Sequence, residues 1–276
     1  MKTPALIAAC LLVLASALNG ALAHEHVQCG KPLVISAAGG VGDVRKAFER
    51  FQRELGGEDN GNAPGPLKKG FRSIDWDADA VPFDMPGNFF RDVVTRGLEL
   101  VQTDEFRVSN PPKTDPGFPD NLFDSINKDH PNQFQAFSPE RIFSPLEDNH
   151  FSILFSVPAK DDRATVAGYG AIFVDVDNED ETFLQLFGTG AKDLGRFYVP
   201  AYPQGLSFLG VICEASVITR VDVQLGNAEL PQTDLPPEYE VVVMDDFLFS
   251  EPQAIVQKKP AHAPGRKEGS GYGYGR

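Results

Sequence analysis

The stretch Val217-Ile218-Thr219-Arg220-Val221-Asp222-Val223-Gln224-Leu225 decides the fold class, because apolar and polar side chains alternate along it. Successive side chains of a β-strand point to opposite faces, so a period of two predicts a strand with one buried face. Residues 151–157 repeat this pattern, with Phe151, Ile153, Phe155 and Val157 on one parity. Both stretches therefore indicate half-buried strands of an antiparallel sheet.

Several other segments are apolar on both parities and predict central strands that are buried on both faces. These segments are 164–176, 182–187, 205–212 and 240–249. Short turn segments separate them, and no regular alternation of helix and strand is present. We therefore expect a mainly β protein whose residues 71–252 form a jelly-roll-like β-sandwich.

One helix is expected before the strands, within an N-terminal segment that spans residues 24–70. Apolar residues recur at helical spacing in 43–55, at Val44, Phe48, Phe51 and Leu55. Asp43 can cap the start of this helix, Gly56 and Gly57 end it, and a Gly/Pro-rich loop follows. The preceding Ala38-Gly39-Gly40-Val41-Gly42 lacks the spacing of a dinucleotide-binding turn, so we interpret it as a helix-entry turn.

Residues 1–23 have the features of a secretory signal peptide. Lys2 supplies the basic start, residues 5–18 the apolar core, and Ala21-Leu22-Ala23 a small-x-small cleavage site. An uncleaved N-terminal anchor is the alternative. No later segment is long and apolar enough for a membrane span, so we expect a secreted, extracellular protein without a transmembrane anchor.

Cleavage after Ala23 removes Cys10 and leaves two cysteines, Cys29 and Cys213. Two cysteines in an exported chain predict one disulfide. Two unpaired thiols are the alternative.

The charge of the chain is strongly acidic, with 25 Lys and Arg against 39 Asp and Glu and a net charge of −14. This balance argues against nucleic acid as a partner, since phosphate binding needs a basic face. The C-terminal residues 253–276 differ, because they are basic and rich in Gly and Tyr. We expect this tail to be disordered.

Two acidic pairs are candidates for a metal site, and calcium is the ion that carboxylate oxygens favour. Asp175 and Asp177 lie at the start of a dense acidic run, and Asp245 and Asp246 lie in the last predicted strand. An EF-hand is excluded by the wrong residues at its sixth and twelfth positions. The alternatives are a solvated turn for the first pair and a buried Asp bonded to backbone amides for the second.

Cleavage after Ala23 would also make the mature chain begin at His24-Glu25-His26. A free amine with an imidazole at the third position binds Cu²⁺, and an N-terminal His is the first ligand of copper oxygenases that attack polysaccharides. The second imidazole of such an enzyme would be His130 or His150. A frayed polar N-terminus is the alternative.

Four aromatic residues are candidates for stacking against a sugar ring. They are Trp76, Tyr169, Tyr198 and Tyr202. For Trp76, a place in the core of the sandwich is the alternative. A serine hydrolase is disfavoured, because Gly205-Leu206-Ser207-Phe208-Leu209 lacks the last glycine of a nucleophile elbow.

Six motifs, in order along the chain, carry a resemblance to a known group of proteins. They are Asn60–Pro66, Phe71–Asp77, Phe137–Pro139, Gly168–Asp177, Gly205–Val211 and Val243–Phe247. With these motifs the chain resembles exported, mostly bacterial proteins without an assigned activity, some of whose relatives carry sorting signals of the PEP-CTERM type. The resemblance implies export and a β-rich domain like those of galactose-binding modules. It implies no catalytic residues, and the Gly/Tyr tail differs from the anchoring helix of the sorted relatives.

From these observations we expect a secreted, non-catalytic binding module for an extracellular glycan or matrix component. An acidic structural or mineral-associated matrix protein is the alternative, because of the net negative charge. A secreted copper-dependent or hydrolytic enzyme is the third hypothesis.

Overall fold

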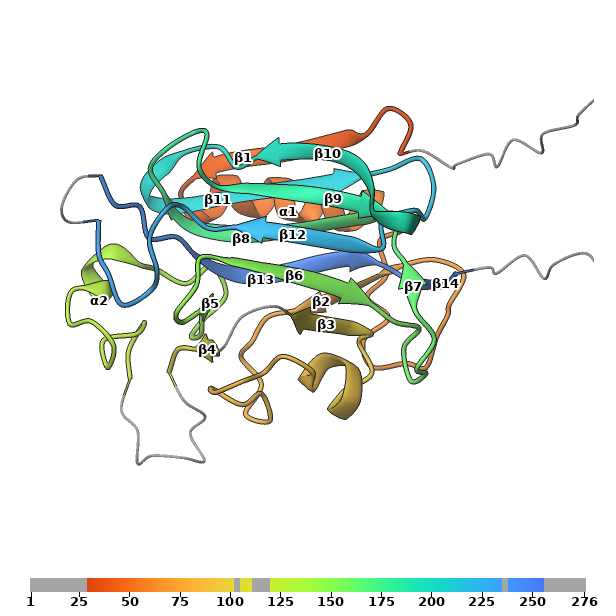
Figure 1. The fold of residues 1–276 in the computed structure, drawn as a ribbon, viewed down its shortest axis with the longest axis horizontal. Coiled ribbons are helices and arrows are strands. Elements are labelled where there is room, and N and C mark those ends of the chain that lie inside the picture. Colours follow the sequence, from red (N-terminus) through yellow and green to blue (C-terminus); the bar gives the residue numbers. More distant parts are fainter. Residues whose placement is uncertain (1–28, 102–104, 111–119, 235–237, 256–276) are drawn as a thin grey trace, which may run out of the picture.

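Two antiparallel β-sheets stacked face to face make up most of the protein (Figure 1). The structure is a computed structural model that describes residues 29–101, 105–110, 120–234 and 238–255. The predicted signal peptide 1–23, His24, His26 and the tail from residue 256 onward lie outside the described residues. The prediction of a mainly β, sandwich-like protein is confirmed.

The larger sheet has seven strands, all paired antiparallel. Its order is β1 (Leu33–Gly39), β11 (Tyr202–Ile212), β8 (Gly168–Val176), β13 (Val243–Ser250), β5 (Phe143–Pro145) and β4 (Phe106–Val108), and β2 (Phe71–Ile74) also pairs with β13.

The smaller sheet has five strands, and the alternating stretch 217–225 lies at its centre. Its order is β10 (Lys192–Tyr198), β9 (Phe183–Gly188), β12 (Arg220–Gln224), β6 (His150–Phe155) and β3 (Leu98–Val101). Val221 and Val223 of β12 are buried, whereas Arg220, Asp222 and Gln224 are partly exposed. The period of two therefore places one face of this sheet in the core, as predicted.

The helices are few, and the predicted N-terminal helix is the longest of them. They are α1 (Val41–Glu54), the π-helical turn η1 (Phe89–Val93), α2 (His130–Gln133) and the 3₁₀ turn η2 (Thr189–Ala191). Helix α1 packs on the outer face of the seven-stranded sheet, opposite the five-stranded sheet (Figure 1). Gly170 and Gly210 face each other across β8 and β11, and a Cβ on either one would collide with the ring of Phe51. These glycines let α1 approach the sheet closely.

The apolar core consequently has two layers, one on each face of the seven-stranded sheet. Phe151, Ile153 and Phe155 of β6 pack between the sheets. Phe48 and Phe51 of α1 pack against the outer face of the seven-stranded sheet. Strand β8 is buried along its whole length because it belongs to both layers. This explains why its sequence is apolar on both parities.

Two predicted boundaries of the sandwich are wrong. Strand β1 lies in the segment 24–70, which is predicted to be outside the sandwich, yet it pairs with β11 over seven residues. At the other boundary, β14 (Gln253–Ala254) pairs with β7 (Ala164–Thr165), so residues 253–254 are not part of a disordered tail. The sandwich therefore includes β1 from before residue 71, and β14 forms a separate two-stranded sheet with β7 just beyond residue 252.

The predicted disulfide is confirmed, because Cys29 and Cys213 are bonded across a separation of 184 residues. Cys213 also donates its N–H to Ala167, and Ala167 donates to the Ser250 hydroxyl. The disulfide thus lies at the end of the sandwich where β8 begins and β13 stops. Across the described residues, no helix has the length and apolar character needed to cross a bilayer.

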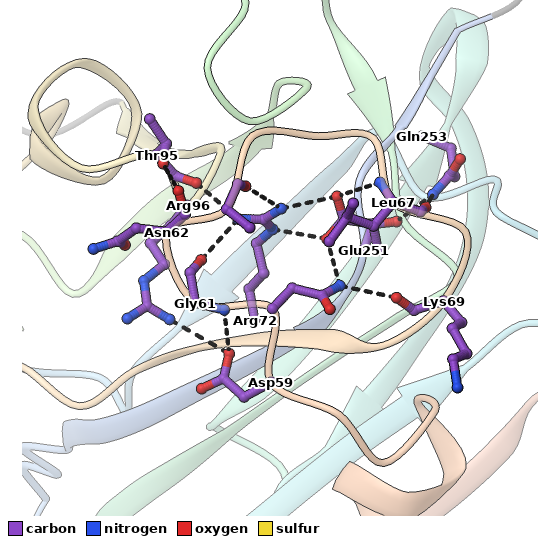
Figure 2. Close-up of polar contacts among 12 residues, drawn as sticks. Asp59, Gly61, Asn62, Leu67, Lys69, Arg72, Thr95, Arg96, Glu251 and Gln253 are labelled. Carbon is purple, nitrogen blue, oxygen red and sulfur yellow. Dashed lines mark hydrogen bonds and ion pairs between the residues drawn. The ribbon is translucent and has the colours of Figure 1, made fainter.

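A buried ion pair lies at this same end and holds the loop that precedes β2 (Figure 2). The Arg72 guanidinium uses all five of its N–H donors, two on the carboxylate oxygens of Glu251 and three on the carbonyls of Gly61, Ala63 and Thr95. Each Glu251 oxygen accepts one further bond, from Leu67 N–H or from Asn60. The pair is fully buried and fully hydrogen-bonded, which is the condition under which buried charge is tolerated.

Candidate functional site

The opposite end of the sandwich gathers most of the residues that the sequence singled out. Strands β8, β10 and β12 end there and β9 and β11 begin there, at the left of Figure 1. Asp175 and Asp177, the exposed Tyr198 and Tyr202, and the loop that leads into β13 all belong to this end. We refer to it as the acidic end.

Asp175 has an unusual backbone conformation that keeps it out of the inter-sheet core. Its φ is 65°, and residues 203–205 of β11 form an irregularity opposite it. Val174 packs beneath α1 while Val176 packs between the sheets, so the strand's alternation breaks at Asp175. Irregularities of this kind redirect a side chain. Here the Asp175 Oδ1 accepts the Gln204 N–H at 2.6 Å.

Three carboxylates meet at this point, those of Asp175, Asp177 and Asp234, each with an oxygen within 4.8 Å of the others. Asp234 comes from the segment before β13 and accepts the Val241 N–H at 2.9 Å. Asp175 Oδ2 and Asp177 Oδ1 are buried and have no hydrogen-bond partner among the described residues. We call this group the aspartate triad.

Burial raises the pKa of Asp175 to about 7, and the negative charges of Asp234 and Asp177 act in the same direction. The Gln204 N–H and the Gln133 side chain oppose this shift. Burial and the charge of Asp234 also raise the pKa of Asp177. Asp175 and Asp177 therefore lie in a buried, negatively charged environment that disfavours the ionised form of both carboxyl groups.

Glu240 lies directly behind the aspartate triad and holds the backbone of Asp177. It is fully buried and accepts hydrogen bonds from the Asp177 N–H at 3.2 Å and from the Asn178 side chain at 2.6 Å. Burial, followed by the neighbouring Glu181, raises the pKa of Glu240 to about 7. The sequence pattern does not indicate Glu240 or Asp234, because both lie about 60 residues from Asp175 along the chain.

The exposed ring of Tyr198 is supported by a chain of side chains on the open face of the five-stranded sheet. Tyr198 packs against Phe183, with ring centroids 5.7 Å apart, and Arg196 lies 3.9 Å above the Phe183 ring. Arg196 donates to Gln185 at 3.0 Å, and Gln185 donates to Asp193 at 2.6 Å. We call these five residues the Tyr198 platform. Each member fixes the next, so the ring of Tyr198 is preorganised.

Tyr202 lies across a three-residue crossover from Tyr198, at the start of β11. The two tyrosines are equally exposed, each retaining 45% of its accessible surface. The Tyr202 ring rests on Gly205, where a Cβ would collide with it. Tyr202 also pairs with Val176, which lies between Asp175 and Asp177. Tyr202 and the aspartate triad are therefore neighbours.

The other two predicted sugar-binding aromatics are buried, so the prediction is wrong for both. Trp76 is fully buried, stacks on Phe143 at 4.3 Å between ring centroids, and donates its indole N–H to the Asp245 carbonyl. Tyr169 is fully buried between the sheets. Neither ring offers a face to a ligand, and the alternative of a core Trp holds.

Asp245 and Asp246 are both buried, at an irregularity of β13 that faces Ser138. Asp245 accepts the N–H groups of Phe137 and Ser138, and Asp246 accepts the Ser138 hydroxyl at 2.7 Å. Within the described chain, the aspartate triad is the one acidic or His-containing group of three compact enough for a shared ion, and this pair does not belong to it. The structure supports the alternative for this pair, a buried Asp bonded to backbone amides.

The copper hypothesis concerns residues that lie mostly outside the described part of the chain. His24 and His26 are not described. His130 is buried, and its two ring nitrogens face the carbonyl oxygens of Phe123 and Gln232, at 3.3 and 2.8 Å. In this arrangement His130 does not offer a ring nitrogen to a metal.

Comparison with protein-family models, with curated proteins and with solved structures found no match to this chain.

Proposed function

We propose that this protein is a secreted, non-catalytic binding module of the jelly-roll-like, galactose-binding type that takes an extracellular glycan at its acidic end. The observation that carries the proposal is the Tyr198 platform, an exposed aromatic ring held rigid beside polar side chains. Sugar rings present C–H faces that pack on aromatic rings, while their hydroxyls hydrogen-bond to polar neighbours. Preorganisation lowers the entropic cost of binding.

The surroundings of the platform fit this role. Gln185, Asp193 and Arg196 place amide, carboxylate and guanidinium groups on the same sheet face as Tyr198. Tyr202 offers a second exposed ring across the crossover. The Cys29–Cys213 disulfide suits a protein that works in an oxidising compartment, which supports the proposed export.

An array of extracellular polysaccharides tests the proposal with the purified protein. Wild type should bind a subset of glycans, and Tyr198→Ala should weaken that binding about tenfold or more, the level of a hot-spot tyrosine. Tyr202→Ala should weaken it less, because Tyr202 lacks the supporting chain of side chains. Val93→Ala, which truncates an exposed apolar side chain on η1, should bind like wild type.

Equal binding by wild type and Tyr198→Ala would contradict the proposal.

The second candidate is an acidic matrix protein, favoured by the net charge of −14. It predicts adsorption to a calcium mineral that salt weakens, without preference among glycans, because such binding rests on screened surface charge.

A further inference from the structure

We propose that the aspartate triad is a calcium site that ties together the end of β8, the turn after it and the segment before β13. The inference rests on the geometry of Asp175, Asp177 and Asp234 alone and does not depend on glycan binding. Asp175 and Asp177 lie two residues apart at the end of β8, and Asp234 comes from the segment before β13, so a shared ion would cross-link two backbone segments that are far apart along the chain.

The first argument is the burial of unsatisfied oxygen. Asp175 keeps only 1% of its accessible surface, and its Oδ1 is taken up by the Gln204 N–H. Its Oδ2 is left without a hydrogen-bond partner among the described residues, as is the Oδ1 of Asp177. Buried polar atoms are nearly always partnered, so two such atoms on adjacent carboxylates indicate a ligand between them.

The second argument is charge. No Lys or Arg of the described residues forms an ion pair with Asp175, Asp177 or Asp234. Three carboxylates within one small volume repel each other unless a cation or protons neutralise them. A divalent cation neutralises two of the three charges and fills the coordination of both orphaned oxygens at once.

The third argument selects the ion. The donors are hard carboxylate oxygens, which favour Ca²⁺ or Mg²⁺ over the transition metals that prefer His or Cys. Oxygens that bind one Ca²⁺ at about 2.3–2.6 Å lie no more than about 5 Å apart, and the three oxygens satisfy this limit. Mg²⁺ demands a tighter octahedron, whereas Ca²⁺ accepts ligands from irregular loops and strand ends such as these.

Glu240 acts as a positioning residue in this site. Its carboxylate accepts the Asp177 N–H and the Asn178 amide, so it orients the turn that carries Asp177 without facing the ion itself. Glu240→Gln should therefore weaken calcium binding less than Asp177→Asn does, since a glutamine retains one acceptor oxygen for the Asp177 N–H.

Calorimetric titration of the intact mature protein with CaCl₂, together with thermal unfolding in calcium or in chelator, tests the inference. We expect one ion per chain and a higher melting temperature in calcium. At a calcium concentration a hundredfold above Kd, the ratio of folded to unfolded protein should rise about a hundredfold. MgCl₂ should produce a smaller shift at the same concentration.

Matched variants separate a built site from general surface charge. Asp177→Asn and Asp234→Asn change partly exposed residues, so the fold should tolerate them, and each should lower calcium affinity at least tenfold. Asp180→Asn removes an exposed charge from the same acidic run and should bind calcium like wild type. Identical melting curves in calcium and chelator would overturn the inference. A calcium shift that Asp177→Asn and Asp234→Asn leave unchanged would overturn it as well.

Discussion

Both ends of the sandwich bury carboxylates, but among the described residues only one end supplies the compensating cation. Glu251 is bound by a guanidinium that has all five donors occupied, and its own oxygens are filled (Figure 2). The aspartate triad at the acidic end has amide N–H donors, a nearby glutamine and no cationic side chain among the described residues. The comparison teaches that burial alone does not define a site. What distinguishes the acidic end is buried charge that the chain leaves unbalanced.

The two ends also differ in how their backbone segments are tied together. The Arg72 end has the disulfide between Cys29 and Cys213 and the hydrogen bonds that join β2 to the preceding loop. At the acidic end, the backbone segments that carry Asp175, Asp177 and Asp234 meet through carboxylates that repel one another. We therefore expect the Arg72 end to contribute most to the free energy of unfolding. We expect ligand binding to take place at the acidic end.

Removing the disulfide should have the largest effect on stability. Replacing both Cys29 and Cys213 by Ser frees a loop of 184 residues in the unfolded chain, which the loop-entropy model values at about 5 kcal/mol. Urea denaturation of the purified protein would measure the loss. Calcium affinity should not change, because the disulfide lies at the other end of the sandwich. A loss below about 1 kcal/mol would contradict the expected role of the cross-link.

Breaking the buried ion pair should have the next largest effect. Arg72→Met leaves Glu251 buried without its cation and should lower the free energy of unfolding by about 3 kcal/mol. Arg72→Lys should recover little of this, because an ammonium cannot match five donors arranged in a planar fork. Lys46→Ala, which removes an exposed pair with Asp43, is the control and should cost less than about 0.5 kcal/mol. If Arg72→Met unfolds like this control, the two ends do not differ as described.

The Asp245–Asp246 pair should give the smallest of the three effects, a dependence on pH. Burial raises the pKa of Asp246 from 3.8 to about 6. Between pH 4 and 6 the unfolded chain therefore loses this proton while the folded protein keeps it. The folded state binds more protons in this window, so stability should fall as pH rises and level off above pH 6. We expect a fall of the order of 2 kcal/mol.

Asp246→Asn tests this prediction, because an asparagine can still accept the Ser138 hydroxyl but does not titrate. Urea denaturation of both proteins from pH 4 to 7 gives the difference between them, in which the acids remote from Asp246 cancel; Asp245 does not, because the charge of Asp246 helps to raise its pKa. The variant should be the more stable protein at pH 7 and should approach wild type at pH 4. A difference that stays constant across this range would show that Asp246 is not held protonated by its burial.

Much of the fold followed from local pattern. The stripe of Val44, Phe48, Phe51 and Leu55 predicted a helix over 43–55, and the structure places α1 at Val41–Glu54 with all four residues buried. The alternation in 217–225 located β12. Strand β10 is not predicted because its residues are partly or fully exposed along an edge and its register shifts between Asp193 and Gly195, so it carries little apolar signal.

The candidate site was only half predictable. Asp175 and Asp177 stood out because they lie two residues apart at the start of an acidic run, but Asp234 lies in a different segment and joins them only through the pairing of β8 with β13. Trp76 lies between Asp75 and Asp77 and is nevertheless buried, whereas Tyr198 lies between Phe197 and Val199 and is nevertheless exposed. Composition near an aromatic residue does not reveal which side of a sheet it faces.

The sequence by itself determined the sandwich class, the long helix and the disulfide, because side-chain period and a count of two cysteines are properties of the chain before it folds. The tertiary structure alone decided which charges meet. Irregular pairing at Asp175 and at Asp245–Asp246 breaks the period of two, so the faces of these side chains could not be read from alternation. The tertiary structure also places Arg72 against Glu251, which lies 179 residues away along the chain. The aspartate triad has no such partner among the described residues. Hydrogen bonds and charge pairs act over a few ångströms in space, whatever the distance along the chain.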